Sequence, residues 1–461
     1  MPTIIVMNNA TEQMLGQRLN QQQALFAAQA AMRNVWLARP GDVVIATARP
    51  DDDFLAYLAD VLGWHAQDGS PPLEFVTPEI GADSVVLNDE ALLDRDVIRA
   101  LRRAIGTSDG WSMLACYQTA GTARLQEELG LGASGGQAIA RRYAEHFGTD
   151  LLNRKSHFRQ FAVGTGLPVP EGAIVTDEAG LKRAIDALLP QTGKVMVKLD
   201  NGAGGTGNVV LSEGEVGPSP GAFQSILLPV ANVDNRAEMV SALWQTLQQR
   251  SSGPLVVEAY YPADAMFYLE FVIEPDGRAE FTNSGSIRLR RSTDPAAASL
   301  FWVGLELPAA LAPARLAEAT LHCGRLLQLA AMMGYRGHIN IDAIITPAGR
   351  LLFNEANARW GGGTVLHEVA TRLLGAGFTA SHVAASFRDV PSPGFRRLVA
   401  LLEASGLAFN ASNCTGIVVL ACDDAHTQTF EALVIAPSST VARAMERRLL
   451  ELVHHERGIA A

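Results

Sequence analysis

Two carboxylates and two of the three asparagines in one short segment constrain this chain more than any other feature. Residues 338–363 read HINIDAIITPAGRLLFNEANARWGGG, where two apolar, β-branched runs flank a Pro-Ala-Gly-Arg tetrapeptide, a composition that favours a tight turn. The segment therefore predicts an antiparallel hairpin. With the turn centred between the Ala and the Gly, two pairs of residues are opposed, Asp342 with Glu355 and Asn340 with Asn357. Because opposed residues share a face of a sheet, the four side chains are expected to form one polar patch.

This polar patch predicts a metal site. Two carboxylates side by side repel each other and gain nothing from burial unless a positive charge lies between them. Magnesium prefers oxygen ligands, commonly one or two carboxylates together with substrate phosphates. Asp342, Glu355 and Asn357 are therefore expected to bind Mg²⁺ or Mn²⁺. The alternative is a solvated sheet face that carries acidic residues, since the opposite faces of the two strands are not clearly more apolar.

A glycine-rich segment supplies groups suited to the phosphates of a nucleotide. Residues 195–199 are typical of a strand, residues 201–208 (NGAGGTGN) form a glycine loop, and a second strand is expected at 209–211. The loop satisfies GxGxxG, but a dinucleotide fingerprint opens into a helix and here a strand follows. The loop is therefore predicted to be a flap whose amides fold over phosphates, with Lys198 aimed at one of them. A flexible hairpin turn with a solvent-exposed lysine is the alternative.

Short apolar runs alternate with amphipathic stretches from residue 3 to about residue 130. Strands are predicted at Thr3–Met7, Val43–Ala46, Ser84–Leu87 and Met113–Cys116, with helices between them, and this order indicates βαβ units and a parallel sheet. Asn153 is expected to cap a helix that runs through Val163. Near the C-terminus, strands at 416–421 and 432–435 and a helix at 439–454 predict a small α+β segment.

Length, charge and cysteine content exclude several classes of protein. The 461 residues correspond to about three structural units, at roughly 150 residues per domain. The net charge of −11 has the wrong sign for a protein that grips nucleic-acid backbones. Four cysteines without a CxxC pair predict no disulfide framework, and no apolar run approaches the roughly 18 residues of a membrane span. A cytoplasmic protein with no nucleic-acid or membrane partner is expected.

Together, these residues resemble the ATP-grasp superfamily of carboxylate-amine ligases over roughly residues 150–375. The resemblance implies that Asp342, Glu355 and Asn357 are the metal ligands, with Arg359 as a phosphate or acyl-phosphate contact. It implies a nucleotide site whose residues are Lys155, Lys198, the flap glycines Gly204, Gly205 and Gly207, and the adenine hinge at Glu258 and Tyr260. The ribose contact stays open between Asp264 and Glu270, of which Asp264 is the assigned candidate.

The resemblance also implies an α/β and α+β architecture. A parallel α/β pre-ATP-grasp domain would occupy residues 1–148, an ATP-grasp domain residues 149–378 with its lid at about 170–257, and an α+β segment residues 379–461. In this arrangement the chain is similar to the pre-ATP-grasp peptide ligases of the pheganomycin type. The implied activity uses ATP to form an amide or peptide bond through an acyl phosphate. Amino acids or peptides of specialised metabolism would supply the acid and the amine, and a homodimer is common in this family.

Two alternatives concern the acid substrate and the reaction. Arg288 and Arg290 alternate on one predicted strand, where either could clamp a substrate carboxylate, and a solvated basic strand is the other interpretation. Rival functions are a kinase, a carboxylase with the same nucleotide site, and an ATP-binding module without turnover. The chain lacks HRD and DFG tripeptides, which argues against a protein kinase. Release of ADP that depends on both an acid and an amine would separate a ligase from the module.

Overall fold

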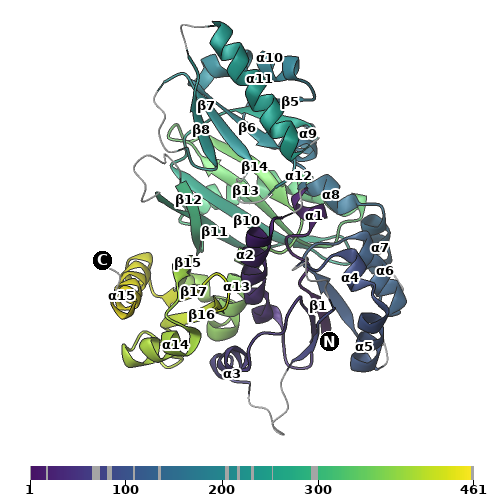
Figure 1. Ribbon diagram of the computed structural model, residues 1–461, viewed down its shortest axis with the longest axis vertical. Coiled ribbons are helices and arrows are strands. Elements are labelled where there is room, and N and C mark those ends of the chain that lie inside the picture. The colour runs from purple at the N-terminus through teal and green to yellow at the C-terminus, as the bar shows by residue number, and fades with distance from the viewer. Residues whose placement is uncertain are drawn as a thin grey trace.

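The computed structural model describes residues 2–16, 19–64, 73–79, 86–106, 110–132, 136–202, 207–214, 219–229, 233–251, 253–291 and 300–457. The strands in these ranges form a four-stranded, a five-stranded and an eight-stranded sheet. Figure 1 shows the five-stranded sheet with its helices at the top, the N-terminal sheet at the lower right and the C-terminal helices at the lower left. The eight-stranded sheet lies between them. The predicted α/β and α+β fold class is confirmed.

The N-terminal sheet is parallel, as the alternation of strands and helices predicts. It consists of β1 (Thr3–Val6), β2 (Val43–Ile45), β3 (Glu74–Val76) and β4 (Ser112–Ala115) in the order β3-β2-β1-β4. The helices of this region are α1 (Glu12–Leu15), α2 (Gln21–Met32), the 3-10 helix η1 (Arg33–Leu37), α3 (Asp52–Val61), α4 (Asp89–Leu92), α5 (Arg95–Ile105), α6 (Ala120–Glu128), α7 (Gly136–Glu145) and α8 (Gly148–Asn153). The strand predicted at 84–87 is wrong where it can be tested, because Val86 and Leu87 lie outside any strand; Ser84 and Val85 fall outside the described residues.

The five-stranded sheet carries the glycine loop. Its strands are β5 (Gly172–Val175), β6 (Lys194–Leu199), β7 (Asn208–Ser212), β8 (Gln224–Leu227) and β9 (Leu255–Ala259), in the order β5-β9-β6-β7-β8. Helices α10 (Glu178–Thr192) and α11 (Val233–Arg250) share an apolar core with one face of it, which includes Val195 and Val197. Because strand residues alternate, Lys198 lies on the opposite face. The antiparallel pairing of β6 and β7 confirms strands on both sides of the loop.

The eight-stranded sheet joins the middle of the chain to its C-terminal part. Its strand order is β14-β13-β10-β11-β12-β15-β17-β16. The strands are β10 (Ala265–Ile273), β11 (Ala279–Arg291), β12 (Leu300–Leu307), β13 (Gly337–Ile345), β14 (Leu351–Asn357), β15 (Val383–Pro391), β16 (Gly416–Asp423) and β17 (Thr429–Ala436). The remaining helices are α9 (Lys155–Thr165), α12 (Pro313–Met333), α13 (Gly362–Leu374), the 3-10 helix η2 (Phe378–Ala380), α14 (Phe395–Ala404) and α15 (Ser439–Glu456).

The two faces of this sheet have different characters. On one face, Ile339 and Ile341 of β13 pack with Cys323 of α12 in an apolar core. The intervening residues of β13 therefore lie on the other face, together with Tyr268, which is paired with Asp342. We call the face that carries Tyr268 and Asp342 the site face.

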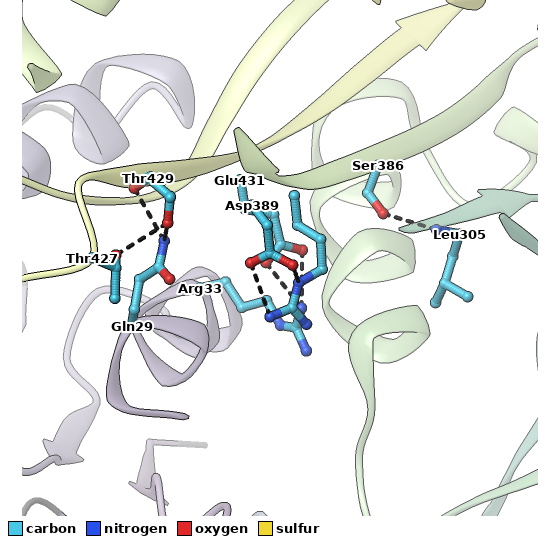
Figure 2. Close-up of polar contacts among 9 residues, drawn as sticks. Gln29, Arg33, Leu305, Ser386, Asp389, Thr427, Thr429 and Glu431 are labelled. Atoms are coloured by element: carbon cyan, nitrogen blue, oxygen red, sulfur yellow. Dashed lines mark hydrogen bonds and ion pairs between the residues drawn. The ribbon is translucent and has the colours of Figure 1, made fainter. Parts of the chain in front are cut away.

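Polar contacts attach the N-terminal helix α2 and the following 3-10 helix η1 to strand β17 (Figure 2). The side chain of Gln29 donates to the backbone and hydroxyl oxygens of Thr429 on β17, at 3.0 and 2.8 Å. Arg33 forms an ion pair with Glu431 at 2.9 Å, in which the side chains are 13% and 6% exposed. Breaking a buried pair of this kind typically costs about 3–5 kcal/mol, so these contacts hold α2 and η1 against β17.

Within the described ranges, no helix has both the length and the apolar character that a membrane crossing requires.

Candidate active site

The hairpin of β13 and β14 brings the two predicted carboxylates together. Asp342 is paired with Glu355 and Asn340 with Asn357, as the sequence predicts. The predicted turn centre is wrong, however: Ile345 pairs with Leu351 and not with Leu352, so the pairing near the turn is displaced by one residue. A β-bulge beyond Asp342 accommodates the extra residue of β14 and restores the predicted pairs at the site.

A buried lysine contacts this pair of carboxylates. Lys155 is the first residue of α9 and is 6% exposed, and its Nζ lies 3.2 Å from Oε2 of Glu355. The Nζ also donates to the backbone oxygen of Gly202, at the start of the glycine loop, at 3.2 Å. Lys155 therefore links the eight-stranded sheet to the glycine loop.

The start of α9 is held by a side chain that the sequence analysis missed. The predicted N-cap at Asn153 is wrong, because Arg154 occupies the N-cap position without a side-chain bond. Instead, Oδ1 of Asp200 accepts a hydrogen bond from the backbone nitrogen of Ser156 at 2.8 Å. Asn153 contacts a different residue, since its Oδ1 accepts a hydrogen bond of 2.7 Å from Nη1 of Arg359. Asn153 thus orients Arg359, while Asp200 holds the start of the helix that carries Lys155.

The charges around the hairpin separate the pKa values of its two carboxyls. Burial and the neighbouring Glu355 raise the pKa of Asp342 well above its usual range. Burial also opposes ionisation of Glu355, but Lys155, Lys198 and Arg359 outweigh it and lower its pKa to about 2. In the ligand-free protein, Glu355 is therefore ionised, while Asp342 retains its proton far more readily. A divalent cation would remove this asymmetry, because it favours the ionised form of both.

The remaining ligand candidate fits a metal site as well. The side chain of Asn357 is half-buried and has no hydrogen-bond partner in the described part of the chain. One amide oxygen and two carboxylates are the oxygen ligands that magnesium prefers, with phosphates completing the set. The described residues contain no group of three or more His, Cys, Asp or Glu side chains that could hold a metal without such help.

Three charged side chains meet on the face of the five-stranded sheet that is opposite α10 and α11. Nζ of Lys198 lies 2.6 Å from Oε2 of Glu258, and Nη1 of Arg159, from α9, lies 2.9 Å from Oε1. Lys198 and Glu258 are each 5% exposed. The Glu258 carboxylate is thus neutralised by two cations of the protein itself, and Arg159 is a residue that the sequence analysis missed. Next to this cluster, burial raises the pKa of Tyr260 to about 12.

The structure separates some predicted residues from this region. Arg288 lies on the face opposite the site face, where its Nη2 forms an ion pair of 2.6 Å with Glu446 of α15. This placement does not bring Arg288 to the carboxylate pair, because the alternation along β11 directs its side chain to the other side of the sheet. Asp264 is exposed beside the turn end of the hairpin, where its backbone nitrogen donates to the oxygen of Ile345 at 2.8 Å.

Of the three flap glycines, one can be examined. Gly204 and Gly205 lie outside the described residues. At Gly207, an added Cβ would lie 2.7 Å from a methyl carbon of Leu199, so any larger residue there must displace that side chain. The requirement for glycine at this position comes from packing across the two strands.

A cavity of about 200 Å³ lies between the N-terminal sheet and the eight-stranded sheet. It lies between β4, α6 and α7 on one side and the ends of β10 and β13 on the other, and Arg359 lines it. Four cationic or imidazole side chains and one carboxylate contribute to its wall: Arg141, Arg336, Arg359, His338 and Glu274. The cavity therefore carries an excess of positive charge.

The sequence analysis missed a buried hydrogen-bond network next to this cavity. Glu270 of β10 is fully buried and accepts hydrogen bonds from Asn283 at 3.1 Å, from Thr364, and from Nδ1 of His338, 3.1 Å away. These bonds occupy both carboxylate oxygens, which favours Asp264 over Glu270 as the ribose contact. A signal was present in the sequence, since Glu270 is the one charged residue in the apolar run AMFYLEFVI. His338 lies four residues before Asp342, on the same face of the same strand.

Comparisons with known proteins agree with this architecture. Residues 31–131 match the family model of the pre-ATP-grasp domain, and residues 397–449 match that of the PGM1 C-terminal domain. An N5-carboxyaminoimidazole ribonucleotide synthetase, solved as its ADP complex, is similar at 13% identity and a TM-score of 0.53, over 99% of this chain and 97% of that chain. No curated protein matches the sequence.

Two further solved structures extend the comparison. The biotin carboxylase domain of the 2-oxoglutarate carboxylase from Hydrogenobacter thermophilus, in complex with MgADP, ADP and bicarbonate, is similar at 15% identity and a TM-score of 0.55, over 97% of this chain and 89% of that chain. An L-amino acid ligase from Bacillus licheniformis is similar at 14% identity and a TM-score of 0.50, over 97% and 96%. At these identities the likeness establishes the fold. The chain contains a pre-ATP-grasp domain and has the fold of the ATP-grasp ligases and carboxylases.

Proposed function

We propose that the protein is an ATP-dependent ligase that joins a carboxylic acid to an amine through an acyl phosphate and releases ADP and phosphate. The observation that carries this proposal is the opposition of Asp342 and Glu355 on the site face, with Lys155 in contact and Arg359 beside them. Transfer of a phosphoryl group depends on positioning and charge neutralisation, and this arrangement supplies both.

Each side of the site has a defined role in this proposal. Asp342, Glu355 and Asn357 hold Mg²⁺ or Mn²⁺, which when bound neutralises charge on the phosphates. Lys155 already contacts both the hairpin and the start of the glycine loop, so it is placed to hold a phosphate between them. Arg359 neutralises the transferred phosphoryl group and the acid that receives it.

The lid side of the site would hold the rest of the nucleotide. Lys198 would exchange part of its contact with Glu258 for a phosphate oxygen, since a lysine ammonium has three donors. The flap glycines approach the phosphates through their backbone amides. Tyr260 and Asp264 border the adenine and the ribose in this arrangement.

The cavity beside Arg359 supports amino acids or peptides as substrates. Arg141 has no hydrogen-bond or ion-pair partner among the residues that the structure describes, and it lines the cavity. A free guanidinium in a partly enclosed site is well suited to bind a carboxylate with two parallel hydrogen bonds. An amine substrate that also carries a carboxylate satisfies this requirement. The likeness to an L-amino acid ligase agrees with this substrate class.

The test is a matrix of acids and amines incubated with the protein and Mg-ATP, with ADP and phosphate measured separately. A ligase releases both only when an acid and an amine are present together. Trapping with hydroxylamine in place of the amine should give a hydroxamate of the acid. The Asp342→Asn variant is the inactive control. Release of ADP without phosphate would indicate a kinase, dependence on bicarbonate a carboxylase, and nucleotide binding without ADP release a non-catalytic module.

A further inference from the structure

A histidine in the cavity wall is held by a carboxylate that has no other function in the proposed reaction. Nδ1 of His338 lies 3.1 Å from Oε1 of Glu270, whose side chain is 1% exposed. Glu270 also accepts hydrogen bonds from Asn283 and Thr364, and the Thr364 hydroxyl accepts one of 2.8 Å from the backbone nitrogen of Gly361. Strand β11 and the first turn of α13 thus fix the carboxylate before it contacts the histidine.

This arrangement decides which nitrogen of His338 is free. Glu270 already accepts hydrogen bonds from Asn283 and Thr364, and a carboxylate only accepts, so we assign the proton of the bond that it shares with His338 to Nδ1. In the neutral ring, Nε2 is then an unprotonated acceptor. A histidine oriented in this way by a buried carboxylate is a general base in other enzymes, where the carboxylate fixes the tautomer and stabilises the imidazolium.

The position of His338 fits a role beside the carboxylate pair. Its side chain is 21% exposed and lines the same cavity as Arg359. His338 and Asp342 lie four residues apart on the same face of β13, which corresponds to roughly 13 Å along the strand. Arg359 lines this cavity together with His338, and its charge lowers the pKa of both carboxyls of the hairpin. The cavity that contains His338 therefore shares one wall residue with the proposed phosphate site.

We propose that His338 is the base that accepts a proton from the amine substrate, and that Glu270 is its positioning residue. The inference rests on the proposed ligase function. The ammonium form of the amine gives one proton to Nε2 of His338. The freed lone pair attacks the carbonyl carbon of the acyl phosphate and forms the C–N bond, and the C–O bond to phosphate breaks with its electron pair on the leaving phosphate. The second proton of the nitrogen leaves with that phosphate.

The chemistry of amines explains why such a base is needed. An amino group of ordinary pKa, about 7.7–8.0 for an α-amino group and about 10.4 for a lysine side chain, is mainly protonated at pH 7 and has no lone pair to attack with. A general base typically accelerates such a step by about 10²–10⁴-fold. Acyl-phosphate formation itself needs no base, because the attacking carboxylate is already ionised.

Other titratable groups near His338 must be considered in its pH dependence. Burial lowers the pKa of His367, on α13, and its Nδ1 is buried with no hydrogen-bond partner among the residues that the structure describes. The guanidinium of Arg336 donates to three backbone oxygens. The charged or titratable groups near His338 are Glu270 of β10, Glu274 just after β10, Tyr335 and Arg336 before β13, Arg359 after β14, His367 of α13 and Arg141 of α7.

The experiment separates amine attack from acid activation. The His338→Gln variant is assayed in two reactions with the same acid: ligation to the amine, and hydroxamate formation with hydroxylamine, which is already largely unprotonated at pH 7. We expect ligation at pH 7 to fall at least 100-fold while hydroxamate formation changes less than threefold. Ligation by the variant should recover as the pH rises toward the pKa of the amine. Equal loss in both reactions, or a loss that high pH does not recover, would overturn the proposal.

A positioning variant and a matched control complete the test. Glu270→Gln should slow ligation while leaving hydroxamate formation nearly unchanged, because the ring loses the acceptor that orients it. An unchanged ratio of the two rates would remove Glu270 from this role. His426→Gln is the control, since His426 forms a similar pair with Asp423, at 3.4 Å, on an exposed turn. If the unmodified protein forms neither hydroxamate nor amide with any acid, the ligase function fails, and with it this proposal; selective effects in an active protein test His338 alone.

Discussion

Replacing either carboxylate of the hairpin by its amide should abolish ADP formation, but the two changes should alter the stability of the ligand-free protein in opposite directions. Glu355→Gln removes an ionised group that Lys155 contacts at 3.2 Å, so we expect a lower Tm. Asp342→Asn removes a carboxyl whose ionisation is opposed by burial and by Glu355, so we expect a higher Tm. The two residues are direct neighbours, and both substitutions preserve shape.

The size of the first effect follows from the pKa of Glu355. Its value falls from 4.5 to about 2, and at about 1.4 kcal/mol per unit of pKa this corresponds to at most about 3–4 kcal/mol of folding free energy at pH 7. Because the folded-state pKa is lowered, this stabilisation is present above pH 4.5 and is lost as the pH falls toward 2. For Asp342 the sign is reversed: a raised pKa means that its ionisation opposes folding at neutral pH, and the amide removes that cost.

Thermal melts at pH 7 and near pH 4, with and without Mg-ATP, test this reasoning. A change of this size lowers Tm by a few degrees, and the difference between Glu355→Gln and the unmodified protein should shrink at the lower pH. Asp52→Asn, at a side chain that is 85% exposed, is the control and should leave Tm unchanged. A higher Tm for Glu355→Gln would show that repulsion from Asp342 outweighs the contact with Lys155. A lower Tm for Asp342→Asn would show that burial does not penalise this carboxyl.

The remaining predictions concern the nucleotide and the two arginines. Lys198→Ala should weaken ATP binding at least tenfold by calorimetry. Its Tm should fall only slightly, because Glu258 keeps its ion pair with Arg159. Normal affinity for ATP would remove the lysine from the site. Hydrogen exchange at residues 200–209 should slow when Mg-ATP is added, and unchanged exchange would contradict the flap interpretation. Arg359→Gln should reduce ADP formation by at least 100-fold, whereas Arg288→Gln should lower Tm and leave kcat within a factor of three. Equal losses of kcat would mean that the opposite face of the sheet reaches the substrate.

The sequence was most informative where structure is local. The alternation of strands and helices predicts the parallel N-terminal sheet, and the apolar runs on both sides of the glycine loop predict β6 and β7. The third parallel strand escaped prediction because β3 spans only Glu74–Val76 and begins with a charged residue, whereas the equally short β2 is wholly apolar. A three-residue strand depends on the neighbouring strand β2 for its hydrogen bonds, and this pairing is not encoded in its own residues.

Contacts between candidate site residues were predictable where a single hairpin makes them, and not where they join distant parts of the chain. Asp342 and Glu355 lie thirteen positions apart on adjacent strands, so a turn is enough to bring them together. Arg159 reaches Glu258 over 99 positions, and Glu270 reaches His338 over 68 positions. Such contacts depend on how whole sheets pack. Alternation alone likewise places Arg288 on a face but does not say which face is the site face.

The register of the hairpin shows how closely the proposed chemistry depends on one extra residue. Near the turn, Ile345 pairs with Leu351, and if that register continued, Asp342 would pair with Asn354 and Glu355 with Ile341. Glu355 would then share the face of Ile341, in the apolar core with α12, because a shift of one residue reverses the side of every side chain that follows. The bulge prevents this and places both carboxylates on the site face, where Lys155 and Arg359 meet them. A local irregularity of β14, rather than the regular hairpin that the sequence predicts, therefore creates the paired carboxylates on which metal and phosphate binding would depend.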